Sequence, residues 1–148
     1  MRRVVGYAPG AYDLFHIGHL NVLKRAKSQC DWLIAGVVSD EMCERAKGRP
    51  PVVPLVERLE IVSNIKCVDH VHAEFTPEKM DAWRELRFDR IFKGDDWRGT
   101  PKGDKLEKDF ADVGVEVVYF PYTVHTSSTL LRAALSIALD GSVAATGS

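Results

Sequence analysis

The chain has 148 residues, of which 45% are hydrophobic and 28% charged, a composition typical of one globular domain with its own core. The formal net charge is −1, so no basic field indicates nucleic acid as a partner, and no apolar run approaches the ~20 residues that span a bilayer. The three cysteines, Cys30, Cys43 and Cys67, are odd in number and widely spaced. This usage favours the reducing cytoplasm over a disulfide framework or a zinc site.

Short β-branched runs alternate with amphipathic stretches along the chain. The expected strands cover Arg3–Tyr7, Trp32–Val38, His70–Ala73, Arg90–Lys93 and Glu116–Phe120. The expected helices cover Gly18–Gln29, Asp40–Ala46, Leu55–Ile65, Pro77–Leu86, Lys105–Val113 and Ser128–Leu139. Strands at this spacing with helices between them predict βαβ units, and therefore an α/β fold with a parallel sheet.

Local residues mark two of the expected helix boundaries. Thr76 followed by Pro77 is typical of a helix N-cap with proline at the first helical position. Gly114 is typical of the glycine that ends a helix, here before the last expected strand. We find no repeat or linker, so we expect one domain over residues 1–140. The small residues 141–148 are expected to form a flexible tail.

The turn after the first expected strand holds the most informative residues, Gly10 to His19. A strand that turns through glycine into a helix is where α/β proteins bind phosphates. His16 and His19 are spaced i, i+3 across the helix start, so their rings point the same way. Gly18 between them permits close approach to the backbone. The pattern predicts a polyphosphate on the helix N-terminus, with the imidazoles as additional donors.

Ligands of a parallel sheet bind at the carboxyl ends of its strands. The loops expected at those ends include residues 8–16, 39 onward, 94–99 and 121–127. Most of the unusual residues of the sequence fall in these loops, a coincidence that core packing does not predict.

The stretch Gly10–His19 resembles the signature of the HxGH nucleotidyltransferase superfamily, and the resemblance extends from Val4 to Ala134. Lys47-Gly48-Arg49-Pro50-Pro51 resembles the lysine loop of its cytidylyltransferase-like branch. Gly94-Asp95-Asp96-Trp97 is similar to a motif of glycerol-3-phosphate cytidylyltransferases, which we take as the closest likeness. The resemblance implies a Rossmann-like fold, a doubly wound parallel sheet of five strands with helices on both faces.

The last motif departs from the cytidylyltransferases. Tyr122 stands where that family carries an arginine that clamps the triphosphate. The segment that follows, Ser127-Ser128-Thr129-Leu130-Leu131-Arg132, resembles the helix start of adenylyltransferases in the same superfamily. Arg132 could supply the missing charge. The choice between CTP and ATP is therefore left open at this point.

The resemblance implies a reaction in which CMP passes from CTP to a phospho-alcohol, giving a CDP-alcohol and pyrophosphate. Glycerol 3-phosphate is the first acceptor to test. A phosphate monoester is already an anion at neutral pH, since its second pKa is ~6, so the site must align and neutralise charge rather than supply a strong base. One alternative is an adenylyltransferase that uses ATP on a sugar phosphate or another phosphate acceptor. The other is an inactive nucleotide-binding regulator, which the loss of the family arginine motivates.

The same resemblance assigns roles to individual residues. The catalytic residues implied are His16, His19 and Lys47. Nucleotide binding is implied for Gly10, Ala11, Tyr12, Gly18, Arg49, Asp95, Thr123, Ser127, Ser128, Thr129 and Arg132. Acceptor binding is implied for Asp13, Lys47, Arg58, Asp96 and Trp97.

Structural roles compete with several of these assignments. Tyr12 could be an aromatic ring packed under the loop. Asp13 could have a structural role or help to place Mg²⁺. Arg58 could form an ion pair, and Asp95 and Asp96 could cap a turn. Lys79 could bind the acceptor phosphate or lie on a solvated face.

The remaining expectations concern cofactor and partners. Mg²⁺ is expected because a triphosphate normally arrives with it, and the sequence contains nothing that resembles a dedicated metal cage. The expected partners are CTP or ATP and a small phosphate-bearing acceptor, without nucleic acid or membrane. The family resemblance suggests a homodimer.

Overall fold

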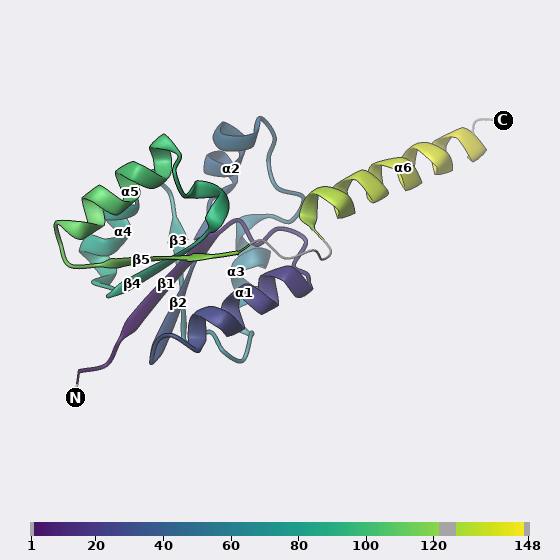
Figure 1. Ribbon diagram of the computed structural model, residues 1–148. Helices are drawn as coiled ribbons and strands as arrows, with labels where there is room; N and C mark the ends of the chain where they lie inside the picture. The colour runs from purple at the N-terminus through teal and green to yellow at the C-terminus, as the bar shows by residue number, and fades with distance from the viewer. Residues whose placement is uncertain (1, 122–126, 147–148) are drawn as a thin grey trace.

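A computed structural model describes residues 2–121 and 127–146, and its strands and helices alternate along the chain (Figure 1). The strands are β1 (Val5–Gly10), β2 (Trp32–Val38), β3 (His70–Glu74), β4 (Arg90–Gly94) and β5 (Glu116–Phe120). The helices are α1 (Ile17–Lys27), α2 (Asp40–Lys47), α3 (Leu55–Ser63), α4 (Lys79–Leu86), α5 (Pro101–Ala111) and α6 (Ser128–Thr146), with a short 3₁₀ helix, η1 (Asp95–Trp97), after β4.

The five strands form one parallel sheet in the order β3-β2-β1-β4-β5, which confirms the predicted fold. β1 is central: Gly10 pairs with Val37 of β2, and Tyr7 pairs with Ile91 of β4. The strand order reverses at β1, because β2 and β3 lie on one side of it and the later strands β4 and β5 lie on the other. Ligands of such sheets bind at the carboxyl ends of the strands beside this reversal, here Gly10 and Gly94.

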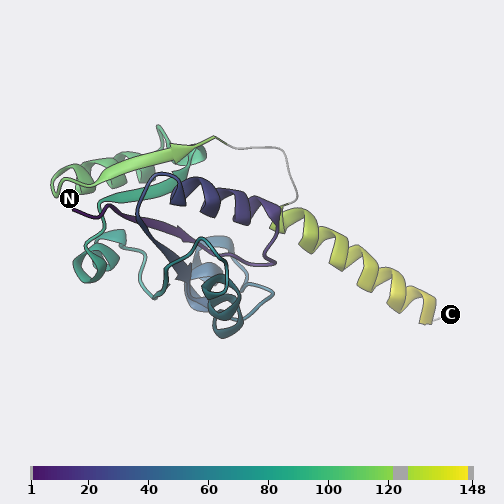
Figure 2. The same ribbon diagram turned by 90° about the horizontal axis from the view of Figure 1, so that it is seen from below.

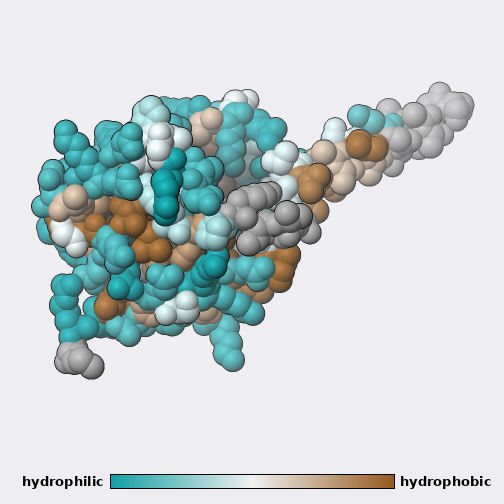
Figure 3. Space-filling model, in the orientation of Figure 1, coloured by the Kyte–Doolittle hydropathy of each residue, from teal (hydrophilic) through white to brown (hydrophobic). Residues whose placement is uncertain are grey.

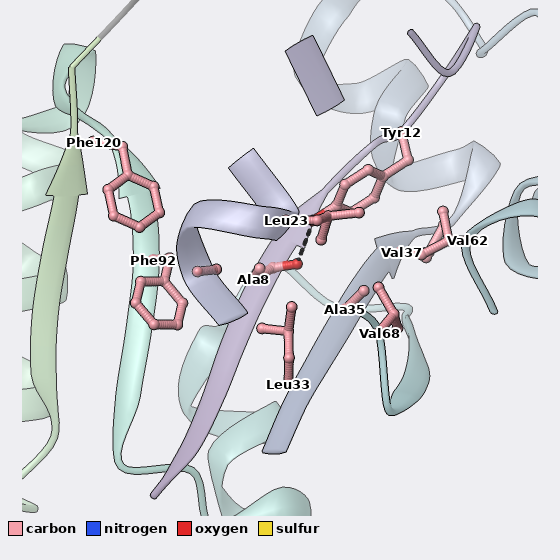
Figure 4. Close-up of a cluster of buried hydrophobic side chains, with 11 residues drawn as sticks. Ala8, Tyr12, Leu23, Leu33, Ala35, Val37, Val62, Val68, Phe92 and Phe120 are labelled. Atoms are coloured by element: carbon pink, nitrogen blue, oxygen red, sulfur yellow. Dashed lines mark hydrogen bonds between the residues drawn. The ribbon is translucent and has the colours of Figure 1, made fainter. Parts of the chain in front are cut away.

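Helices cover both faces of the sheet, as predicted (Figure 2). On one face, Leu23 of α1 and Val62 of α3 pack against sheet residues that include Leu33, Ala35 and Phe92 (Figure 4). Burying each large side chain of this kind stabilises the fold by about 1.5–3 kcal/mol.

The opposite face is covered by α4 and α5. Ala82 of α4 and Phe110 of α5 pack against Tyr7 and Ile91, together with Phe88, whose ring stacks on that of Tyr7 at 4.6 Å between centroids. The carboxyl ends of the strands are therefore left between two layers of helices.

The predicted boundary at Thr76 and Pro77 is wrong. α4 begins at Lys79, two residues after the proline, and its N-cap, Glu78, makes no side-chain cap bond. Thr76 instead donates from Oγ1 to a carboxylate oxygen of Asp81 at 2.8 Å. The same pattern of threonine and proline occurs at Thr100 and Pro101, where it does begin a helix.

Other boundaries agree more closely. β2 and β5 have the predicted limits, whereas β1 begins at Val5 rather than Arg3 and runs to Gly10. Gly114 adopts a left-handed conformation with φ of 74°, as its position after α5 predicted.

α6 extends away from the body of the molecule (Figures 1 and 3). It continues to Thr146, past the boundary at residue 140 that the sequence predicted for the folded domain. Its exposed apolar side chains include Leu130, Leu135, Ile137 and Leu139. In the described ranges 2–121 and 127–146, no helix has both the length and the apolar character that crossing a bilayer requires.

Candidate functional site

His16 and His19 cap the N-terminus of α1 reciprocally. The Nδ1 atom of His16 accepts the backbone N–H of Gly18 at 3.0 Å, and the Nδ1 atom of His19 accepts the backbone N–H of His16 at 3.2 Å. Two donors of the helix start are satisfied in this way. The two rings lie 4.0 Å apart between centroids, and both are half-buried.

This capping fixes the tautomer of both rings. An Nδ1 atom that accepts a hydrogen bond carries no proton, so in the neutral imidazole the proton is on Nε2. Each ring therefore presents an N–H group at its other end. Two neighbouring imidazole donors at a helix N-terminus suit phosphate oxygens, which accept hydrogen bonds only.

The turn between β1 and α1 is held in a strained conformation. Tyr12 and Leu14 have positive φ values, 53° and 51°, which cost of order 1–3 kcal/mol each when the residue is not glycine. Tyr12 is held by its buried ring and by a hydrogen bond from its hydroxyl to the Ala8 carbonyl at 2.8 Å (Figure 4). The Tyr12 ring thus has the packed role that the sequence left as an alternative.

Asp13 ties this turn to the loop after α2. Its carboxylate accepts the backbone N–H groups of Val52 and Val53, both at 2.9 Å, and its side chain is 2% exposed. Its carbonyl accepts the Ser128 hydroxyl at 2.6 Å. Both carboxylate oxygens are thus engaged inside the protein, which supports a structural role for Asp13, and the acceptor-binding role expected for it stays a prediction.

The described residues do not fit a metal ion held by the protein. No group of three His, Cys, Asp or Glu side chains gathers among residues 2–121 and 127–146. Asp13, the buried carboxylate nearest the turn, is committed to backbone N–H groups.

Arg58 also has a structural role, and the acceptor-binding role expected for it is wrong. The residue is 1% exposed, and its side chain donates to the carbonyls of Ala11, Val38 and Val53 at 2.7–2.8 Å. Its remaining arm pairs with Asp40 at 2.6 Å. One guanidinium therefore joins the β1–α1 turn, the end of β2 and the start of α3.

A first cavity, of about 210 Å³, opens between the β1–α1 turn, α1 and α6. We refer to it as the α1–α6 cavity. Its lining includes His19 and Lys47, together with Gly10, Ala11, Tyr12, Asp13, Ser128 and Arg132. His16 lies beside this cavity rather than in its lining, next to the ring of His19.

Arg132 presents unsatisfied donors at this cavity. Its Nη2 atom lies 3.6 Å from the Asp13 carboxylate, whereas Nε and Nη1 are buried without a hydrogen-bond partner among the described residues. An arginine is always charged, and leaving buried donors unpaired is costly. An anion in the α1–α6 cavity would satisfy them.

The start of α6 uses two hydroxyl groups for structure. Ser127 accepts the backbone N–H of Leu130 at 3.0 Å, and Ser128 donates to the Asp13 carbonyl. Thr129 is exposed. Ser127 thus caps α6, and Ser128 ties α6 to the β1–α1 turn. The side-chain contacts with a nucleotide that we expected for both serines would compete with these hydrogen bonds.

A second cavity, of about 530 Å³, lies between α2, α4 and α5, and we refer to it as the α2–α5 cavity. Its apolar walls include Val38, Met42, Met80, Leu106 and Phe110. Five lysines line it: Lys47, Lys79, Lys93, Lys102 and Lys105. Of these, the sequence singled out Lys47 for the site and raised Lys79 only as an alternative.

Lys47 connects the two cavities, since it lines both, together with Gly10 and Ala11. It is the last residue of α2 and is exposed. Arg49 lies near it, beside Asp13 and Arg132. The structure thus brings the two predicted histidines, the lysine loop and Arg132 to one edge of the sheet.

The motif after β4 lies at the same edge. Trp97 lines the α2–α5 cavity, whereas Asp95 and Asp96 are exposed on η1. Neither carboxylate caps this turn by a side-chain hydrogen bond, so the binding roles expected for the two residues stay predictions. Thr123 and Tyr122 lie outside the described residues.

A buried polar network beneath the α2–α5 cavity was missed by the sequence analysis. Glu74, at the end of β3, accepts the Tyr7 hydroxyl and pairs with Lys79. Tyr7 reaches it across Gly36 of β2, where a Cβ atom would collide with the Tyr7 hydroxyl. Burial and the charge of Glu74 raise the pKa of Tyr7, so the hydroxyl stays protonated and donates. Nothing in the periodicity of the sequence indicated this pairing.

Residues 7–134 match the model of the family described as cytidylyltransferase-like. An ethanolamine-phosphate cytidylyltransferase from Arabidopsis thaliana is 40% identical over 102 residues, covering 66% of this chain and 24% of that protein. An FAD synthase from Pyrococcus horikoshii is 36% identical over 123 residues, covering 82% of this chain and 81% of that protein.

The bifunctional protein HldE from Streptomyces coelicolor is 37% identical over 131 residues, which cover 85% of this chain and 27% of that protein. The chain thus spans about a quarter of the length of HldE and of the ethanolamine-phosphate enzyme, and most of the FAD synthase.

Solved structures agree on the fold. The lipopolysaccharide core biosynthesis protein from Thermoplasma volcanium superimposes with a TM-score of 0.70 at 24% identity, over 84% of this chain and 100% of that chain. The fold match, the family match over residues 7–134 and a sheet edge lined by histidine, lysine and arginine side chains coincide. The chain belongs to the cytidylyltransferase-like family of nucleotidyltransferases.

Proposed function

We propose that this protein transfers CMP from CTP to the phosphate of a phospho-alcohol. The triphosphate binds in the α1–α6 cavity, and the acceptor binds in the α2–α5 cavity. The observation that carries the proposal is that Lys47, with Gly10 and Ala11, lines both cavities. A charge at this junction can contact the attacking phosphate and the phosphate under attack together.

The chemistry requires positioned donors rather than a nucleophilic side chain. An oxygen of the acceptor phosphate attacks the α-phosphorus of CTP, and the bond to the β-phosphate breaks, which releases pyrophosphate. His16 and His19 donate from Nε2 to the oxygens that gain charge, and Arg132 and Lys47 neutralise the two anions. The acceptor needs no general base, because it is already ionised at neutral pH.

Glycerol 3-phosphate is the first acceptor we propose, on the resemblance of Gly94–Trp97 to glycerol-3-phosphate cytidylyltransferases. ATP is the second candidate for the nucleotide. Two observations support it: the Ser127–Arg132 segment resembles adenylyltransferases, and the FAD synthase match covers 82% of this chain and 81% of that protein. Mg²⁺ enters in this proposal as part of the substrate, bound to the triphosphate.

We also propose a homodimer, as the family resemblance suggests. The exposed apolar side chains of α6, among them Leu135, Ile137 and Leu139, are surface that a second copy would cover (Figure 3). Sedimentation equilibrium should give twice the mass of one chain, and Ile137→Glu should lower it. A single-chain mass for the unaltered protein would contradict this proposal.

Pyrophosphate release with each nucleoside triphosphate and glycerol 3-phosphate tests the reaction. We expect turnover with CTP, and a loss of about 10² in kcat/KM for Lys47→Met, because one charge that contacts both phosphates is removed. Arg45→Met, an exposed residue of the same helix outside both cavities, is the matched control and should keep full activity.

Each outcome of this assay decides one point. Turnover with ATP and not with CTP would overturn the choice of base and leave the reaction class standing. Binding of CTP without turnover on any phosphate acceptor would favour the inactive regulator.

A further inference from the structure

The α2–α5 cavity carries more positive charge than one phosphate requires. Of its five lysines, Lys79 pairs with the buried Glu74, and Lys105 pairs with Glu78 and Asp109. The other three, Lys47, Lys93 and Lys102, form no ion pair within 4.0 Å anywhere in residues 2–121 and 127–146. Lys47 lies at the junction with the α1–α6 cavity, so the charges of the other two remain to be explained.

Lys93 and Lys102 lie against the same aromatic ring. The Nζ atom of Lys93 is 3.9 Å from the centroid of the Trp97 ring, and that of Lys102 is 5.8 Å from it. Cation–π attraction of this kind positions an ammonium group without neutralising it. The ring thus holds two cations on one wall of the cavity.

The position of Trp97 is set by the start of α5. The Thr100 hydroxyl donates to the Trp97 carbonyl at 2.6 Å, and a Cβ atom at Gly103 would collide with that carbonyl. Glycine at this helical position lets η1 pack directly onto α5. The two lysines therefore flank a rigid element rather than a loose loop.

Lys93 bears its charge at a cost. Burial and the charge of Lys79 lower its pKa to about 8, although Glu74 and Asp96 oppose the change and Lys102 adds to it. Lys93 is half-buried, and a cation held partly out of water without a paired anion destabilises a folded protein. An anionic group of the ligand would supply the missing charge.

We propose that the preferred acceptor carries a second acidic group, a carboxylate or a second phosphate, in addition to the phosphate that reacts. Lys93 and Lys102 bind this group beside Trp97, and the phosphate that reacts lies at Lys47. The inference rests on the proposed function, because it takes the α2–α5 cavity as the acceptor site. A cavity of about 530 Å³ has room for a phospho-alcohol that carries a second acidic group.

Two acceptors of matched size test this inference. 3-Phosphoglycerate and glycerol 3-phosphate carry the same phosphate and the same central hydroxyl, and they differ by a carboxylate in place of a hydroxymethyl group. We expect kcat/KM of the unaltered protein to favour 3-phosphoglycerate by about tenfold or more, and Lys93→Met to reduce this ratio about tenfold. Lys108→Met, an exposed residue of α5 outside the cavity, is the matched control and should keep the ratio.

A binding measurement separates the two proposals. At pH 8, calorimetry in two buffers of different ionisation enthalpy should show proton uptake when 3-phosphoglycerate binds, because the carboxylate raises the pKa of Lys93 from about 8. Lys93→Met should abolish this uptake. The melting temperature of Lys93→Met at pH 7 should rise, since a half-buried charge without a paired anion is gone, and a rise shows that the variant folds.

The outcomes are distinguishable. Equal kcat/KM for the two acceptors, unchanged by Lys93→Met, would overturn the proposal that the preferred acceptor carries a second acidic group. The proposed transferase reaction would remain. Absence of pyrophosphate with every acceptor would overturn the proposed reaction. In that case equal affinity for the two compounds would overturn this inference as well, and tighter, Lys93-dependent binding of 3-phosphoglycerate would support it.

Discussion

Replacing His16 or His19 by asparagine should lower kcat by about 10²–10³ while the protein stays folded. The asparagine Oδ1 atom takes the place of Nδ1, so it can still accept the backbone N–H at the start of α1, which His16 accepts at 3.0 Å and His19 at 3.2 Å. What the variant lacks is Nε2, the donor that we assign to the phosphate oxygens. A rate measurement at saturating CTP and acceptor therefore isolates that donor from the cap.

The glutamine variants are the complementary control. In His16→Gln, the amide nitrogen reaches the place of Nε2, whereas the acceptor that caps α1 is lost. We expect His16→Gln to recover more activity than His16→Asn, and to melt at a lower temperature. Full activity of both asparagine variants would contradict the donor roles proposed for these rings. If activity fell only in variants that also melt at a lower temperature, the two rings would act only as caps of α1.

Arg58→Met should lower the free energy of unfolding by about 3–5 kcal/mol, because it leaves a carboxylate and the carbonyls of three half-buried residues without their donor. The guanidinium donates to Ala11, Val38 and Val53 and pairs with Asp40, all at 2.6–2.8 Å. Lysine cannot replace it, since one ammonium does not reproduce the planar fork. Urea unfolding of Arg58→Met and Arg58→Lys measures both effects.

Arg45→Met, exposed on α2, is the matched control and should change the free energy of unfolding by less than about 0.5 kcal/mol. The same experiment distinguishes structure from binding. If Arg58→Met unfolded at the urea concentration of the unaltered protein but had a raised KM for the acceptor, Arg58 would be a ligand of the acceptor after all. The geometry predicts the opposite result.

The arrangement of the β1–α1 turn was predictable because it is local. His16, Gly18 and His19 lie within four residues, and the helix start alone decides how they are arranged. Lys47 and Arg132 were also predicted, on the resemblance of their segments to known motifs. Their place at one sheet edge follows from parallel strands, whose carboxyl ends meet at one edge.

The partners of Asp13 and Arg58 were not predictable from the same motifs. Asp13 accepts from residues 39 and 40 positions away, and Arg58 donates to a carbonyl 47 positions away. A motif records that such a residue is present and not whether its side chain faces a ligand or the protein. The tertiary structure buries both side chains, and groups of the protein itself form hydrogen bonds with the Asp13 carboxylate and the Arg58 guanidinium.

Sequence by itself determined the order of strands and helices, the parallel sheet and the polar turn at its edge, because periodicity and turn residues act over a few positions. Only the tertiary structure decided which charges are paired. Glu74 satisfies Lys79, whereas Lys93 and Lys102 face a shared cavity without a carboxylate partner among the described residues. Pairing depends on distances between segments far apart in the chain, and these distances exist only once the sheet has formed.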